Sequence, residues 1–357
     1  MLKWRPPLAE EDRHEPEPAS FEGRRHPARP RGPTAVILNK NAKRVTERVR
    51  RRIVEVAPEA DVFFTETLEQ AKFVTRRVVD SGYGTVVTGG GDGTVVNTIQ
   101  DVLDRVEATG RERPRFGVLR LGTGNAVADF LGARDYARDL KDFRGAETRD
   151  VHLLKVDGHQ RTPFLGFGWD AFILNNYIRM KEAAERFAVT RALFKSAAGY
   201  LIAGVGKSVP ELLVRRPRYH VRVINTGGLG FRLDAAGQVV ERFAPGAVVY
   251  EGGARMVCAG TTPYYGFKFK IMPFADRTPG MCHVRVADLH PIAAVSRLPS
   301  AWRGTIDHPG MHDFQLSAFR VEFDEEAPFQ IAGDGMGTRR ALDVTVDAPI
   351  RCCHFAD

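Results

Sequence analysis

The sequence predicts an α/β domain followed by a β-rich sandwich domain. Over residues 34–150, short apolar runs alternate with helical patterns, which favours parallel strands in a layered sheet. After about residue 150, short runs with β propensity are separated by Gly, Pro and Asp, as is typical of an antiparallel sandwich or barrel. The 357 residues, 43% of them hydrophobic, are enough for two domains.

In the first half, strands and helices alternate in order. The apolar run Ala35–Leu38 predicts a strand that ends in Asn39-Lys40-Asn41, and a basic helix then runs towards Val56. The elements expected next are a strand over 61–65, a helix over 68–79, a strand over 85–88, a helix over 95–103 and a strand over 116–119. Such a domain binds ligands at the carboxyl ends of its strands.

The second half is expected to contain one helical stretch, over 172–205, among many short strands. The predicted strands cover 151–156, 161–167, 219–225, 247–259, 267–272, 282–287, 318–323, 329–331 and 342–346. Residues 1–33 are rich in proline, arginine and glutamate, so a disordered tail is expected there. The boundaries are therefore 1–33 for the tail, 34–150 and 151–340 for the domains, and 341–357 for a C-terminal segment.

Composition limits the classes of function. The chain has no long apolar segment that would span a membrane and no signal-peptide core, so a cytoplasmic protein is expected. Its four cysteines lack metal-type spacing and are expected to be reduced and structural. The net charge of +8 favours an anionic partner, but no nucleic-acid reader motif is present. The basic run over 43–52 is better explained as the solvated face of a helix.

Two glycine-rich turns carry the chemistry. Gly89 to Thr94 reads Gly-Gly-Gly-Asp-Gly-Thr between an apolar strand and a helical pattern. Such a turn presents backbone N–H groups and the positive end of a helix to a phosphate. Asp92 adds a hard oxygen ligand suited to Mg²⁺. A second turn, Leu121-Gly122-Thr123-Gly124-Asn125, follows the next strand, with an ordinary tight turn capped by Asn125 as the alternative.

The ordered motifs resemble those of the soluble lipid kinases that include diacylglycerol and sphingosine kinases. The resemblance covers roughly residues 34 to 350. It rests on Asn39-Lys40-Asn41, the two glycine-rich turns, Gly166-Phe167-Gly168-Trp169-Asp170-Ala171, and Asp334-Gly335. It implies an ATP-binding domain with a fold like that of NAD kinases and diacylglycerol kinases. A β-rich domain would follow, with the lipid acceptor entering between the two domains and the last segment returning to the first domain.

The resemblance also implies roles for individual residues. ATP would lie against Asn39, Lys40, Gly89, Gly90, Gly91, Gly93, Thr94, Gly122, Thr123, Gly124 and Asn125. Lys40 would neutralise phosphate, although a plain surface lysine at a strand end is an equal alternative. Candidates for an acyl-chain cleft are Tyr264, Tyr265, Phe267 and the apolar helical stretch over 193–205, with ordinary core packing the favoured alternative.

Three aspartates are candidates for catalysis. Asp92 is expected to bind magnesium and align phosphate, Asp170 to orient the acceptor hydroxyl, and Asp334 to act as the base. Helix N-capping is an alternative for Asp170. The sequence alone does not decide which aspartate takes the proton.

Three positions depart from the family pattern. Thr98 stands where a glutamate is usual. The late motif is usually Asp-Gly-Glu, and Met336 stands in place of its glutamate. Around Pro279 the chain lacks the Asp-Asp-Gly of a structural magnesium loop, with Asp276 only a weak substitute. A nucleotide- or lipid-binding sensor, and a kinase of a soluble acceptor such as NAD, therefore stay open.

The expected function is that of an ATP- and Mg²⁺-dependent lipid kinase that phosphorylates a hydroxyl of a diacylglycerol-like or sphingoid-base-like lipid. The expected location is cytoplasmic and peripheral at a membrane surface. A homodimer is kept open, and the identity of the lipid is not determined by the sequence because acyl recognition depends mostly on apolar shape.

Overall fold

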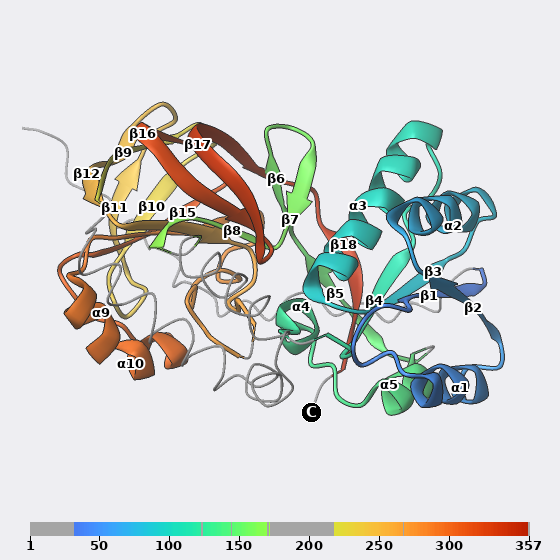
Figure 1. Cartoon of the computed structure of the whole chain (residues 1–357). Helices are drawn as coiled ribbons and strands as arrows, with labels where there is room; N and C mark the ends of the chain where they lie inside the picture. The colour runs from blue at the N-terminus through green and yellow to red at the C-terminus, as the bar shows by residue number, and fades with distance from the viewer. Residues whose placement is uncertain are drawn as a thin grey trace, which may run out of the picture.

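The computed structural model describes residues 32–122, 124–143, 145–169, 171, 218–266 and 268–355. Two sheets organise them, one in each half of the molecule (Figure 1). The residues of the predicted tail up to 31 and of the predicted helix over 172–205 lie outside the described residues.

The N-terminal sheet has six strands in the order β2-β1-β3-β4-β18-β5. The first four strands are parallel, while β18, near the end of the chain, pairs parallel with β4 and antiparallel with β5. Its strands are β1 (Thr34–Asn39), β2 (Ala60–Thr65), β3 (Thr85–Gly89), β4 (Arg115–Leu119), β5 (Glu147–Val151) and β18 (Ile350–His354). The last strand thus fills an interior position of the first sheet.

Helices cover both faces of this sheet, giving three layers. Alternate residues of β1 enter opposite cores: Ala35 and Ile37 pack with α2 and α3, whereas Val36 and Leu38 pack with α1 and α5. The helices are α1 (Glu47–Val56), α2 (Leu68–Asp80), α3 (Asp92–Thr109), α4 (Ala126–Phe130) and α5 (Tyr136–Asp142). The α/β prediction is confirmed.

The C-terminal sheet contains twelve strands and is antiparallel. Its long strand β16 pairs with β9 over Phe319–Phe323 and then with β8 over Phe329–Ile331, so the sheet divides along β16. The strands are β6 (Leu154–Val156), β7 (Gln160–Thr162), β8 (Phe164–Gly168), β9 (Tyr219–Asn225), β10 (Gly230–Leu233), β11 (Val239–Phe243), β12 (Val248–Ala254), β13 (Met256–Gly260), β14 (Cys282–Ala287), β15 (Met311–Leu316), β16 (Ala318–Ile331) and β17 (Asp334–Val346). The β-rich prediction is confirmed.

Three local predictions in this half are wrong. The described residues 268–272 form turns instead of a strand, because the N–H of Phe269 bonds back to the carbonyl of Gly266. The run over 247–259 is two strands that separate at Arg255. Helices α9 (Pro291–Ser296) and α10 (Leu298–Arg303) are present, so the expectation that helix in this half is confined to 172–205 is wrong. In the described part of the chain, no helix is long and apolar enough to cross a membrane.

Candidate active site

The first glycine turn joins a buried strand to the N-terminus of the longest described helix. Strand β3 is buried along its whole length and ends at Gly89, and α3 begins at Asp92 after the N-cap residue Gly91. The N-cap residue Gly91 has no side chain that could cap this N-terminus, which leaves N–H groups of the first turn available to a ligand. The close packing also requires glycine, since a Cβ atom on Gly90 would lie 2.9 Å from Thr94.

The second glycine turn lies directly against the first. A Cβ atom on Gly122 would lie 2.6 Å from the carbonyl oxygen of Gly90, so the two backbones touch. Asn125 has a left-handed backbone (φ 57°), and its side chain accepts from the Gly122 N–H and donates to the Gly122 carbonyl, both at 2.9 Å. The side-chain amide of Asn125 therefore stabilises the turn through two hydrogen bonds. Helix α4 begins at the next residue.

Asp92 connects the two turns. Its Oδ1 accepts a hydrogen bond of 2.8 Å from the N–H of Ala126, at the start of α4. Its Oδ2 faces Gly124, where an added Cβ atom would lie only 2.5 Å away. Desolvation, partly offset by these backbone N–H groups, raises the pKa of Asp92 to about 6. The side chain is thus a carboxylate at neutral pH with an unusually high proton affinity.

At the end of β1, one predicted residue points into the site and one is paired elsewhere. The Nδ2 of Asn39 donates to the hydroxyl of Thr94 at 3.2 Å, which links β1 to the first turn of α3. Lys40 instead forms an ion pair with Glu66 after β2. The charge of Lys40 is therefore neutralised within the N-terminal domain.

The C-terminal domain contributes Asp334 to the same place. Asp334 is the first residue of β17, and its Oδ2 would lie 3.0 Å from a Cβ atom on Gly93, in the first turn of α3. Although the residue as a whole is exposed, desolvation of the carboxyl raises its pKa. Two carboxyl groups from different domains therefore flank the N-terminus of α3.

Comparisons with known proteins agree with this arrangement. Residues 33–156 match the model of the diacylglycerol kinase catalytic domain. The N-terminal domain belongs to that family.

Solved structures share the fold over most of the chain. One is a candidate diacylglycerol kinase from Bacillus anthracis str. Sterne, with 15% identity and a TM-score of 0.64, covering 90% of this chain and 95% of its own. Another is a diacylglycerol kinase from the same strain, with 13% identity and a TM-score of 0.59, covering 90% of this chain and 97% of its own. A search of curated proteins with the sequence found no match.

A further carboxylate near Asp92, that of Asp129, is absent from the sequence-based predictions. The Oδ1 of Asp129, in α4, pairs with Arg120 at 3.0 Å, and the charge of Asp129 contributes to the raised pKa of Asp92. The helical spacing after Asn125 places Asp129 one turn along α4, which is the signal that was available in the sequence.

The three departures from the family pattern have different settings. Thr98 is buried, and its hydroxyl bonds to the Thr88 hydroxyl at 3.2 Å and the Thr94 carbonyl at 2.9 Å. Met336 is an exposed side chain on β17. Asp276 forms an ion pair of 2.7 Å with Arg149 of β5. A salt-bridged Asp276 is a poor replacement for a structural metal ligand.

Several predicted residues lie in the C-terminal core or outside the described residues. Tyr265 stacks on Phe164 with ring centroids 4.4 Å apart and donates to the Leu165 carbonyl, which is ordinary core packing. Tyr264 is half-buried between cores of the two domains. Thr123, Asp170 and Phe267 lie outside the described residues.

Proposed function

We propose that the protein is an ATP- and Mg²⁺-dependent kinase that transfers the γ-phosphoryl group to a hydroxyl of a diacylglycerol-like or sphingoid-base-like lipid. The observation that carries the proposal is the contact of Asp334 with the first turn of α3. It brings an acid of the β-rich domain to the phosphate-binding end of the kinase domain.

The N–H groups of Gly90, Gly91, Gly93 and Thr94 would bind the phosphates, because they surround the open N-terminus of α3. The second turn, Gly122 to Asn125, would form the other wall, with Gly89 at the base. Asn39 would orient the first turn through Thr94. Lys40 would lie at the rim, its charge balanced by Glu66.

The donor set suits a magnesium ion that arrives with ATP. In the described part of the chain, no group of three or more His, Cys, Asp or Glu side chains converges on a metal position. Asp92 nevertheless offers carboxylate oxygen at the phosphate-binding turn, and Mg²⁺ typically takes one or two protein carboxylates beside substrate phosphates. Asp92 would hold this ion, which when bound would neutralise charge on the transferred group.

The transfer needs a base for the acceptor hydroxyl. The acceptor oxygen would attack the γ-phosphorus, forming a P–O bond as the bond to ADP breaks, while the hydroxyl proton passes to a carboxylate. Asp334 is the candidate base, since its raised pKa increases its affinity for that proton. Asp170 would orient the hydroxyl. The net charge of +8 supports action at an anionic membrane surface.

The test incubates purified full-length protein with radiolabelled ATP, Mg²⁺ and separate acceptors: vesicles with diacylglycerol, sphingosine or ceramide, and soluble NAD. The expected product is a labelled diacylglycerol or sphingoid lipid, reduced roughly a hundredfold or more in Asp334→Asn. The matched control is Asp343→Asn, an exposed aspartate on the same strand that pairs with Arg320. Labelled NAD would contradict the lipid assignment. ATP binding without product from any acceptor would favour a sensor.

A further inference from the structure

One face of helix α3 contacts the C-terminal domain along the length of the helix. Gly93, Val96, Gln100, Asp104 and Glu107 follow each other at intervals of three or four residues, so they lie on one stripe of the helix. At the first position Gly93 meets Asp334. At the next, Val96 enters the core of the C-terminal domain, whereas the adjacent Val95 enters the core of the N-terminal one.

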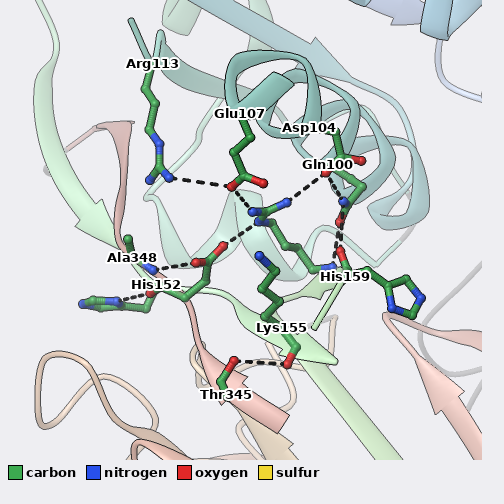
Figure 2. A network of polar contacts seen from close by, with 11 residues as sticks. Gln100, Asp104, Glu107, Arg113, His152, Lys155, His159, Thr345 and Ala348 are labelled. Atoms are coloured by element: carbon green, nitrogen blue, oxygen red, sulfur yellow. Dashed lines mark hydrogen bonds and ion pairs between the residues drawn. The ribbon is translucent and has the colours of Figure 1, made fainter. Parts of the chain in front are cut away.

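The far end of the stripe converges on a single buried cation, Arg161, which lies on β7. Its side chain is only 1% exposed. Its Nη1 lies 3.0 Å from Asp104 Oδ1 and its Nη2 pairs with Glu107, while its backbone N–H donates to Gln100 Oε1 at 2.7 Å. Figure 2 shows the side chains of Gln100, Asp104 and Glu107, all from α3, reaching toward the same place.

A third carboxylate ties Arg161 to a chain crossing between the domains. Asp347 follows β17, and its Oδ2 forms an ion pair of 2.5 Å with the Nε of Arg161. The carbonyl of Asp347 accepts a hydrogen bond of 2.9 Å from Nδ1 of His152. His152 lies in the segment between β5 and β6, which is the other connection between the domains. The second ring nitrogen of His152 accepts from the Gly280 N–H at 3.1 Å, which assigns its hydrogen to Nδ1. Arg161 therefore links α3 to both connections between the domains.

We propose that Arg161 is a positioning residue for phosphoryl transfer: by fixing α3 against the β6–β7 hairpin, it sets the separation of Asp92 and Asp334. This inference rests on the proposed function, in which ATP lies on one domain and the base on the other. The stripe contacts the C-terminal domain at Gly93 and Val96, near the start of the helix, and again at Arg161, so loosening the Arg161 contact would let the far end of the helix move relative to the start.

The charges make this contact hard to replace. A buried guanidinium is stable only where carboxylates and hydrogen bonds compensate its lost hydration. Here three acids do so, two on α3 and one just after β17. Asp104 and Glu107 remain half-exposed, so changing them alters the contact without placing a new group in the core. Those two acids are therefore the cleanest positions to test.

The test variant is Asp104→Asn/Glu107→Gln, with Arg161→Lys as a second variant that keeps the charge but loses the planar donor geometry. The matched control is Arg105→Met. Arg105 lies on the same helix and forms a two-point ion pair with Asp80 of α2, within the N-terminal domain. Both changes remove ion pairs of α3, but only the test variants affect the contact between domains.

The first readout separates binding from transfer. We expect kcat for phosphorylation of the acceptor to fall roughly tenfold or more in both test variants, because small misplacements of reacting groups lower the rate steeply. The KM for ATP is expected to change less than about twofold, as the nucleotide turns are intact. Arg105→Met is expected to match the unmodified protein. A rise in the KM for ATP with unchanged kcat would overturn the positioning role.

The second readout does not need activity. All four cysteines are buried, so spin labels at Phe73→Cys on α2 and Val240→Cys on β11, both exposed positions, report the distance between the domains. We expect that distribution to broaden in the test variants and not in Arg105→Met. An unchanged distribution would overturn the inference, even if every acceptor proved inactive. A broadened distribution with no transfer in the unmodified protein would contradict the proposed function alone.

Discussion

Asp92 combines a structural role with the chemical role proposed for it. It ties the two glycine turns together through the Ala126 N–H, yet its burial penalises the charged form that a phosphate site requires. Residues that serve chemistry at a cost to folding are a common feature of active sites. The titration of this one carboxyl can therefore be used to detect that cost.

We predict that Asp92→Asn stabilises the protein at neutral pH. The pKa is about 6 in the folded protein against 3.8 as the ordinary value, so ionisation opposes folding. That penalty, on the order of 1–3 kcal/mol, is complete above pH 6 and is lost as the pH falls towards 4. Urea unfolding of the variant and of the unmodified protein measures the gain in free energy of unfolding. This gain should be less than half as large at pH 4.5 as at pH 7.5. A gain independent of pH would contradict this cause.

At the scale of elements, the two glycine turns form one unit because their backbones are in contact. The Gly122 position lies beside the Gly90 carbonyl, and Asn125 closes the second turn from within. Neither turn can move without the other. The proposed phosphate-binding surface thus depends on a contact between segments more than thirty residues apart in the chain.

We predict that Gly122→Ala weakens ATP binding at least tenfold, because the new methyl group would displace the Gly90 carbonyl from 2.6 Å. Calorimetric titration with ATP measures the affinity. Gly145→Ala is the control, since its methyl group would make only ordinary contact with the Asp142 carbonyl at 3.8 Å. Equal affinities in the two variants would contradict the direct contact of the turns.

At the scale of the whole molecule, the chain crosses from the N-terminal to the C-terminal domain and back. Strand β18 pairs with both β4 and β5, and Cys352 and Cys353 within it are fully buried. The segment that matches the diacylglycerol kinase catalytic domain ends at residue 156 and so lacks this strand. The kinase domain is therefore completed by residues almost 200 positions later.

We predict that residues 33–156 alone do not unfold cooperatively, because the loss of β18 leaves the edges of β4 and β5 unpaired. Joining residues 347–355 to this fragment through a flexible linker should restore a single transition in urea, followed by circular dichroism. Cooperative unfolding of the shorter fragment would show that β18 is dispensable.

Local pattern was enough to predict the two fold classes and the glycine turns. Glycine-rich sequence between a strand and a helix determines backbone geometry over a few residues, so Gly89 to Thr94 could be placed correctly at the start of a helix. The same reasoning failed for the strand predicted over 267–272. Alternating Phe and Lys imitate a strand there, but hydrogen bonds make turns in the described residues 268–272.

Periodicity and residues adjacent in the chain were enough to predict the kind of domain and its glycine-rich turns. Three contacts became visible only in the folded protein: Lys40 with Glu66, Asp334 with Gly93, and Arg161 with α3 and Asp347. Such contacts join residues from 26 to 241 positions apart, and no local pattern encodes them. They arise when two sheets bring distant side chains to the same space.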